Sequence, residues 1–358
     1  DCDSGYVWIE DIPWNVIVLD ENNCFQRQDL DFLQDIIELN FYQMEPLELG
    51  YQSWLDGRLY EFYLYNFNLM VLPESVGDLN FLYKLYLYRN ELIVLPDNIG
   101  DLNNLEYLVV HNNQLSEIPE SIGNLINLRW LDLHSNNLGG DIPLGIFNMN
   151  NLEYLYLSSN QFGCYEYDYD CDDPTEGFDS ECCIIHCDDT DECSGEIPSE
   201  IGNLTNLTHL LLDFNQLTGE ILPEIGNLTN LTELYLSSNQ LTGEIPPEIG
   251  NLTNLKWLYL NDNKLSGRIP SEIGNLMNLE RLVLYQNQLN QEVPESICDL
   301  NLYEFYLNDN QLSGDLPECL CYLPNCIINI FNNQFCPPYP SCIEDYVGDQ
   351  DTSECEEP

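Results

Sequence analysis

Leu82-Tyr-Lys-Leu-Tyr-Leu-Tyr-Arg-Asn-Glu-Leu92 recurs, with small changes, along most of this chain. Leucine occupies its first, fourth, sixth and eleventh positions, and asparagine occupies the ninth. The Leu-x-Leu at its centre alternates with a period of two, which predicts a short strand with one buried face. The asparagine suits a turn directly after the strand, because its side-chain amide can bond neighbouring backbone groups. Each copy therefore predicts one strand and one turn.

The same frame begins at other positions along the chain, namely Leu59, Leu105, Leu128, Leu152, Leu207, Leu231, Leu255, Leu279, Leu302 and, loosely, Asn325. Successive copies are 23 residues apart from Leu59 to Leu128 and 24 residues apart from Leu207 to Leu279. Stacked copies would align their turn asparagines in a ladder of Asn90, Asn113, Asn136, Asn160, Asn215, Asn239, Asn263, Asn287, Asn310 and Asn333.

This pattern resembles the leucine-rich repeat, and eleven copies in register make the resemblance specific. The resemblance implies an α/β solenoid, shaped as an arc or horseshoe, with a parallel sheet on its concave face. The 24-residue copies resemble the plant-receptor class, which implies a second short strand beside the main sheet. The mixture of both lengths also resembles secreted repeat proteins of environmental microbes.

The chain divides into five segments by this pattern. Residues 1–58 are expected to form an amino-terminal cap, and residues 336–358 a carboxy-terminal cap and tail. The repeats occupy residues 59–162 and 194–335, and an acidic, cysteine-rich insertion, residues 163–193, separates them. Within the first cap, apolar residues at helical spacing predict a helix over 29–37, with Asp29 as its N-cap.

Fifteen cysteines indicate an oxidising compartment and a secreted protein, because disulfides rarely persist in the cytosol. We expect Cys2 to pair with Cys24 in the first cap, and Cys164 with Cys193 at the base of the insertion. Equal offsets from the ladder asparagines predict two more disulfides, Cys298–Cys321 and Cys319–Cys342. The sequence leaves open the pairing of Cys171, Cys182, Cys183, Cys187, Cys326, Cys336 and Cys355.

Aromatic residues predict a binding face on the exposed side of the sheet. They stand between or beside the strand leucines, at Tyr63, Tyr86, Tyr107, Trp130, Tyr156, Tyr235, Trp257, Tyr259 and Tyr306. Contiguous amphipathic patches of this kind usually mark an interaction site. The alternative is that aromatics are there because they favour strands. His111 and His134 lie one repeat apart in a neighbouring column, as part of the same face or, alternatively, as ligands of a shared metal.

The insertion carries twelve acidic residues and neither lysine nor arginine. Asp168, Asp170, Asp172 and Asp179 echo the spacing of a calcium loop, although Asp173 replaces the glycine expected at its sixth position. We therefore expect either a bound calcium ion or a solvated acidic loop, and no required cofactor.

Five Asn-Leu-Thr sequons begin at Asn203, Asn206, Asn227, Asn230 and Asn251. They are possible N-glycosylation sites. The repeat consensus itself contains these letters, so it explains the sequons equally well.

The net charge of −53, from 62 acidic and 9 basic residues, disfavours nucleic acid and anionic membranes as partners. No apolar run approaches the length of about 20 residues that spans a membrane. The sequence lacks catalytic motifs, and a hydrolase is only a remote alternative. We expect an extracellular, non-enzymatic protein that associates with copies of itself in a filament or layer at the cell surface. The alternative is a recognition module for a peptide or glycan on the concave aromatic face.

Overall fold

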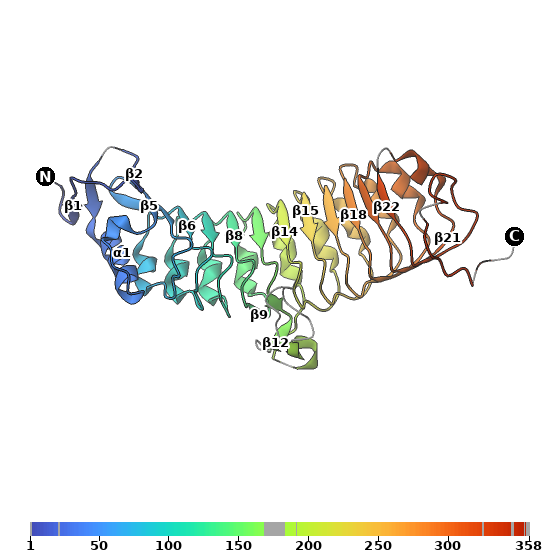
Figure 1. Cartoon of the computed structure of the whole chain (residues 1–358), viewed down its shortest axis with the longest axis horizontal. Helices are drawn as coiled ribbons and strands as arrows, with labels where there is room; N and C mark the ends of the chain where they lie inside the picture. Colours follow the sequence, from blue (N-terminus) through green and yellow to red (C-terminus); the bar gives the residue numbers. More distant parts are fainter. Residues whose placement is uncertain are drawn as a thin grey trace. The chain divides into compact units, whose positions relative to one another are not determined.

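The computed structural model describes residues 2–20, 22–167, 183–190, 192–323, 326–344, 347–353 and 355. The chain forms two compact units, and Figure 1 labels their helices and strands. Unit 1 comprises Asp1–Gly139 and Pro143–Asn160, and unit 2 comprises Gly140–Ile142 and Gln161–Pro358. The fold is a leucine-rich-repeat solenoid, in which each repeat adds one strand to a parallel sheet.

The amino-terminal cap of unit 1 closes one end of its sheet. Strand β1 (Tyr6–Trp8) pairs antiparallel with β3 (Cys24–Gln26), and β2 (Val16–Val18) pairs parallel with β4 (Tyr51–Leu55). Strand β4 then forms an antiparallel hairpin with β5 (Arg58–Tyr63). The short 3-10 helix η1 (Pro46–Glu48) precedes this hairpin.

Helix α1 (Arg27–Leu39) confirms the helix expected in the cap, but its N-cap is Gln26, so the prediction of Asp29 was wrong. The Gln26 side chain accepts from the amide of Arg27. Asp29 is buried inside the first turn, where Arg58 donates to both of its carboxylate oxygens at 2.9 and 3.0 Å. The sequence could not show this partner, which lies in the hairpin. No helix in the described part of the chain is long and apolar enough to cross a membrane.

The repeats of unit 1 continue the sheet in parallel from β5. The strands are β6 (Lys84–Tyr86), β7 (Tyr107–Val109), β8 (Trp130–Asp132) and β10 (Tyr154–Tyr156). The returning segments contain the 3-10 helices η2 (Glu74–Asp78), η3 (Asp97–Asp101), η4 (Glu120–Asn124) and η5 (Leu144–Asn148). The two-residue strand β11 (Gln161–Phe162) belongs to unit 2, as does Gly140 of the two-residue strand β9 (Gly139–Gly140).

Unit 2 has its own run of parallel strands in register: β14 (His209–Leu211), β15 (Glu233–Tyr235), β16 (Trp257–Tyr259), β18 (Arg281–Val283), β20 (Glu304–Tyr306) and β22 (Ile327–Asn329). Its 3-10 helices are η8 (Ser199–Asn203), η9 (Pro223–Asn227), η10 (Pro247–Asn251), η11 (Ser271–Asn275), η12 (Glu295–Asp299) and η13 (Glu318–Tyr322).

A second line of short strands accompanies these repeats, as the resemblance to plant-receptor repeats implies. Strands β17 (Ser266–Gly267), β19 (Gln288–Gln291), β21 (Gln311–Gly314) and β23 (Gln334–Phe335) form a four-stranded parallel sheet. The described part of the insertion is an antiparallel pair, β12 (Cys164–Tyr167) with β13 (Cys183–His186), followed by the 3-10 helix η7 (Cys187–Asp189).

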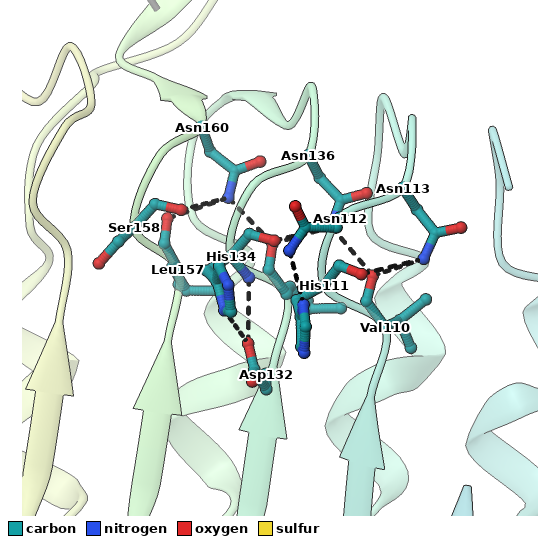
Figure 2. Close-up of polar contacts among 11 residues, drawn as sticks. Val110, His111, Asn112, Asn113, Asp132, His134, Asn136, Leu157, Ser158 and Asn160 are labelled. Atoms are coloured by element: carbon teal, nitrogen blue, oxygen red, sulfur yellow. Dashed lines mark hydrogen bonds and ion pairs between the residues drawn. The ribbon is translucent and has the colours of Figure 1, made fainter. Parts of the chain in front are cut away.

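The ladder of turn asparagines is confirmed, and it ties each repeat to the one before. Figure 2 shows Asn113, Asn136 and Asn160 in successive turns. The amide of Asn136 donates to Leu133 O of its own repeat at 3.0 Å and to Val110 O of the preceding repeat at 3.1 Å. Its side-chain oxygen accepts from Leu115 N. Because Asn136 is only 1% exposed, these bonds satisfy backbone groups that water does not reach.

The disulfide Cys2–Cys24 is present as expected. The other predicted pairings were wrong. At the carboxy-terminal end, Cys298 pairs with Cys319, Cys321 with Cys342, and Cys336 with Cys355.

The two wrong predictions at the carboxy-terminal end, Cys298–Cys321 and Cys319–Cys342, have a physical cause. Equivalent side chains of stacked repeats point the same way, so their Cβ atoms stay a repeat apart, whereas a disulfide needs them about 3.8 Å apart. Gly274, which Cys298 replaces one repeat later, shows the true direction. A Cβ at Gly274 would lie 2.6 Å from the Cβ of Ser296, whose position Cys319 takes in the next repeat. The bond therefore joins non-equivalent positions that face each other.

The insertion also differs from the prediction of Cys164–Cys193. Cys164 pairs with Cys183 across the β12–β13 hairpin, and Cys187 pairs with Cys193 around a short turn. The sequence carried no signal for this pair of strands, in which the Cα atoms of Cys164 and Cys183 lie 5.8 Å apart. Cys171 and Cys182 lie outside the described residues. Cys326 is the free cysteine of the described part of the chain.

Candidate ligand-binding face

The outward side chains of the parallel strands form what we call the sheet face. In each repeat it consists of the outward residues between the first strand leucine and the ladder asparagine. In the repeat of β6 these are Tyr83, Lys84, Tyr86, Tyr88 and Arg89. The strand leucines point inward and are fully buried, as at Leu85 and Leu108. Side chains between them must therefore point outward, because successive strand residues alternate.

Six tyrosines cover the sheet face at β5 and β6 in three facing pairs. Tyr60 and Tyr83 have ring centroids 5.0 Å apart, with planes inclined by 4°. The centroids of Tyr63 and Tyr86 are 4.7 Å apart, and those of Tyr65 and Tyr88 are 4.9 Å apart. The in-register pairing of the two strands places each ring directly against its partner.

Further aromatic side chains follow along the sheet face of unit 1. Tyr107, Trp130 and Tyr154 are in register with one another, and Tyr156 lies two residues after Tyr154. Trp130 stacks on Tyr154 at 4.4 Å and meets the edge of Tyr156 at 5.4 Å. The indole Nε1 of Trp130 is buried, and no hydrogen-bond acceptor for it lies among the described residues. Leaving such a donor unpaired costs about 1–3 kcal/mol, and such a group in a native structure calls for an explanation.

A second column in unit 1 ends at the two histidines. Tyr88 stacks on His111 at 4.8 Å, and His111 stacks on His134 at 4.2 Å. Nδ1 of His134 lies 2.6 Å from Oδ1 of Asp132, and the side-chain amide of Asn112 is bonded to Nδ1 of His111 (Figure 2). Burial lowers the pKa of His111. Asp132 opposes this shift, and His134 and Arg89 add to it. The rings thus complete an aromatic stack, and no cluster of three potential metal ligands occurs in the described part of the chain.

Charges on the sheet face of unit 1 are balanced. Three basic residues, Lys84, Arg89 and Arg129, stand against four acidic ones, Glu61, Glu106, Asp132 and Glu153, in a chain whose net charge is −53. Lys84 lies 3.0 Å from Glu61, and Arg129 lies 2.6 Å from Glu153. The excess negative charge of the chain is therefore carried elsewhere.

In unit 2, the sheet face is built around Arg281. Its guanidinium lies 5.2 Å from the centroid of the Trp257 ring and donates to the hydroxyl of Tyr259 at 3.0 Å. Tyr259 also meets Tyr235 at 4.6 Å, with ring planes at 61°. Tyr306 is on β20 of the same sheet, in register with Val283. The Nε1 of Trp257, like that of Trp130, is buried with no acceptor among the described residues.

The structure thus places all the aromatic residues predicted for binding on sheet faces, four or five to a unit. Sequence reasoning missed the cations that lie among them. The signal was available: five of only nine basic residues fall between the first strand leucine and the ladder asparagine of their repeat, at Lys84, Arg89, Arg129, Lys256 and Arg281.

The other predicted sites are the acidic residues of the insertion and the sequon asparagines. Asp168, Asp170, Asp172 and Asp179 are outside the described residues, so calcium binding stays a prediction. The sequon asparagines Asn203, Asn227, Asn230 and Asn251 are exposed. Asn230 donates to Thr205 O at 2.9 Å and so also links repeats. Glycosylation of these residues and of Asn206 stays a prediction.

Comparison with known protein families finds leucine-rich repeats in this chain. One repeat model matches residues 80–138, and a second matches five copies, at 206–228, 230–252, 254–276, 278–300 and 301–323. The chain is a leucine-rich-repeat solenoid. No curated protein matches its sequence.

Among solved structures, the solenoid is similar to the plant peptide hormone receptor RGFR1 in complex with RGF2. The two share 33% identity with a TM-score of 0.63, over 79% of this chain and 39% of the receptor. It is also similar to the ectodomain of the plant receptor kinase GASSHO1/SCHENGEN3 from Arabidopsis thaliana in complex with CASPARIAN STRIP INTEGRITY FACTOR 2. That match has 31% identity and a TM-score of 0.64, over 80% of this chain and 33% of the receptor. The solenoid thus spans less than half of either structure.

A plant ice-binding protein shares the fold over 89% of this chain and 98% of its own length. The TM-score is 0.65 and the identity is 22%. At this level of identity the likeness concerns the fold alone.

Proposed function

We propose that this solenoid is a non-enzymatic, extracellular recognition module that binds an extended peptide along its sheet face. The observation that carries the proposal is the composition of that face. Aromatic rings in contact with one another and paired charges cover it in both units, with stacked rings in unit 1 and an edge-to-face pair beside Arg281 in unit 2, while the chain as a whole is strongly acidic. Aromatic residues and arginine are the residue types enriched at protein interfaces.

The stacking of the rings favours a peptide over a glycan. Sugar rings usually lie on open aromatic faces, but in Tyr60–Tyr83 and Tyr65–Tyr88 one face of each ring is turned to the neighbouring ring and is therefore not open. What the pairs present outward is ring edges and hydroxyl groups. These groups suit the alternating carbonyl, amide and side-chain groups of an extended peptide.

The paired charges support recognition without catalysis. Lys84, Arg129 and Arg281 each contact a carboxylate of a neighbouring strand, at Glu61, Glu153 and Glu304 respectively. A catalytic acid or base needs a group held for proton transfer to a substrate. Groups already engaged in pairs fit the positioning of a ligand better.

The disulfides support an extracellular location. Six of them fall in the described part of the chain, and disulfides form and persist in oxidising compartments. The two similar receptors are a plant peptide hormone receptor in complex with RGF2 and the ectodomain of a plant membrane receptor kinase in complex with CASPARIAN STRIP INTEGRITY FACTOR 2. These likenesses support the proposal for this chain without identifying its ligand.

A peptide-display selection tests the proposal. Wild-type protein should enrich a family of peptides, and the variant Tyr235→Ala/Trp257→Ala should lose that enrichment. The matched control is Thr229→Ala, an exposed residue after η9, which should enrich the same peptides. Equal enrichment on the face variant and wild type would contradict the proposal.

Self-association is the second candidate, and the end of the sheet in unit 1 favours it. Strand β2 pairs with β4 and is the first strand in the order of its sheet. Ile17, in the middle of this strand, is 58% exposed, and Trp14 and Leu19 on either side of the strand are 84% and 51% exposed. An open strand edge with apolar neighbours is a template for pairing with another chain. Sedimentation velocity in high salt should show oligomers that Ile17→Lys abolishes, whereas a monomer under all conditions argues against this candidate.

A further inference from the structure

The tyrosine pairs of β5 and β6 have a geometry that suits oxidative cross-linking. Both members of each pair are half-buried, so small oxidants can reach them. The two strands hold the rings in register, at centroid separations of 4.7 to 5.0 Å. Two phenol rings held together in this way meet without the diffusion step that limits coupling between separate molecules.

The Tyr63–Tyr86 pair has a proton acceptor in place. The hydroxyl of Tyr63 donates to Oε2 of Glu61 at 3.1 Å. The other oxygen of Glu61 lies 3.0 Å from Nζ of Lys84, and Ser53 Oγ is also within 3.3 Å of Oε2, so the carboxylate is held in position. A phenol loses its proton when it is oxidised by one electron, and a carboxylate already bonded to the hydroxyl can accept it.

We propose that Tyr63 and Tyr86 are a site of dityrosine formation, which would covalently join β5, the strand of the first repeat, to the next strand, β6. The co-reactant is a peroxide acting through a peroxidase. Each phenol gives up one electron and one proton, and the two phenoxyl radicals form a carbon–carbon bond between the ring carbons next to the hydroxyls. The two ring hydrogens then move to the oxygens, which restores both phenols. Overall, two tyrosines and one hydrogen peroxide give one dityrosine and two waters.

The positions of basic residues make this link easy to detect. Trypsin cleaves after Arg58, Lys84 and Arg89, so Tyr63 lies in peptide 59–84 and Tyr86 in peptide 85–89. A Tyr63–Tyr86 bond joins these two peptides with the loss of two hydrogen atoms. Fragmentation of the joined peptide distinguishes this bond from one between Tyr65 and Tyr88. A bond between Tyr60 and Tyr83 would lie within one peptide.

The experiment treats the full chain with a peroxidase and hydrogen peroxide and analyses the monomer isolated by gel filtration. We expect dityrosine fluorescence and the joined peptide from wild type. Tyr86→Phe keeps the ring and its stack but should lose the Tyr63–Tyr86 peptide, and Glu61→Gln should form it more slowly. Tyr322→Phe is the matched control, because Tyr322 is 80% exposed and has no stacking partner in the described part of the chain. It should cross-link as wild type does.

Three results would overturn the proposal. The first is a monomer with no joined peptide although Tyr322 has been oxidised. The second is a link found only between molecules. The third is a link at Tyr65–Tyr88 alone, which Tyr86→Phe leaves unchanged. Circular dichroism of each variant before oxidation would show that a lost link does not come from lost folding.

Discussion

Arg281 donates a hydrogen bond to the hydroxyl of Tyr259 across two adjacent parallel strands, at 3.0 Å. The same guanidinium lies 5.2 Å from the ring of Trp257 and 3.6 Å from Glu304. A single side chain therefore links the strands β16, β18 and β20 on the outside of the sheet, where the leucines do not reach. This surface is ordered by its own contacts before any ligand arrives, which reduces the entropy that binding must overcome.

Replacing Arg281 with alanine should lower the free energy of unfolding by about 1 kcal/mol. This is the magnitude expected when a partly exposed cation–π contact and one hydrogen bond are lost together. Chemical denaturation followed by far-UV circular dichroism would measure it. Arg268→Ala is the control, because Arg268 is exposed and makes no described contact, and it should change stability by less than about 0.5 kcal/mol. Equal effects of the two changes would refute the role given to Arg281.

Asn136→Ala should destabilise unit 1 strongly. The change leaves the buried amide of Leu115 without its partner, at a cost of about 1–3 kcal/mol. The carbonyls of Leu133 and Val110 each lose one of two donors, because Asn160 and Asn113 still donate to them. We therefore expect a total loss of about 1–3 kcal/mol in a thermal or chemical melt. Asn137→Ala, next door and with no described side-chain bond, should be nearly neutral. A neutral Asn136→Ala would contradict the ladder as a source of stability.

Removing the disulfide between Cys298 and Cys319 should destabilise the carboxy-terminal repeats. The two cysteines are 21 residues apart, and closing a loop of this length contributes about 3 kcal/mol in the chain-entropy model. Cys298→Ala/Cys319→Ala should melt at a lower temperature, whereas Cys326→Ala, which removes a free thiol, should not. Peptide mapping without reduction should join Cys298 to Cys319, and finding Cys298 joined to Cys321 would contradict this register.

His111 should make unit 1 less stable at acidic pH. Its pKa in the folded protein is lower than the ordinary value of 6.5, chiefly because of burial. His111 therefore binds a proton more readily in the unfolded chain than in the folded protein. The stability that neutral His111 contributes is present above pH 6.5 and is lost as the pH falls below it. Melts of wild type and His111→Gln across this range measure the effect as a difference. Parallel pH profiles for the two proteins would show that His111 contributes nothing.

Much of this fold could be predicted from the sequence, because its physical causes repeat. Leu85 must be buried if Leu108 and Leu131 are buried, since each strand repeats the same alternation of inward and outward residues. The asparagine ladder follows for the same reason: Asn113 has the same neighbours as Asn136. The positions of the sheet-face aromatics were predictable from that alternation as well.

Features that depend on side-chain direction were not predictable. The cysteines at Cys298 and Cys319 occupy different repeat positions, and only the backbone shows that they face each other. Likewise, the spacing of Tyr63 and Tyr86 places them in one column but does not reveal that their rings stack, or that Glu61 bonds one of them. The ion pair of Asp29 with Arg58 is another example, because it depends on how the cap helix packs on the hairpin.

The most direct test of the central claim is to measure, by titration calorimetry, how tightly single variants bind a peptide that the wild-type protein has enriched. If the sheet face is the binding surface, Trp257→Ala and Arg281→Ala should each weaken binding at least about tenfold, which corresponds to about 1.4 kcal/mol. Thr229→Ala, outside the sheet face, should change the affinity less than about twofold. Unchanged affinity for both face variants, or an equal loss for Thr229→Ala, would contradict the account.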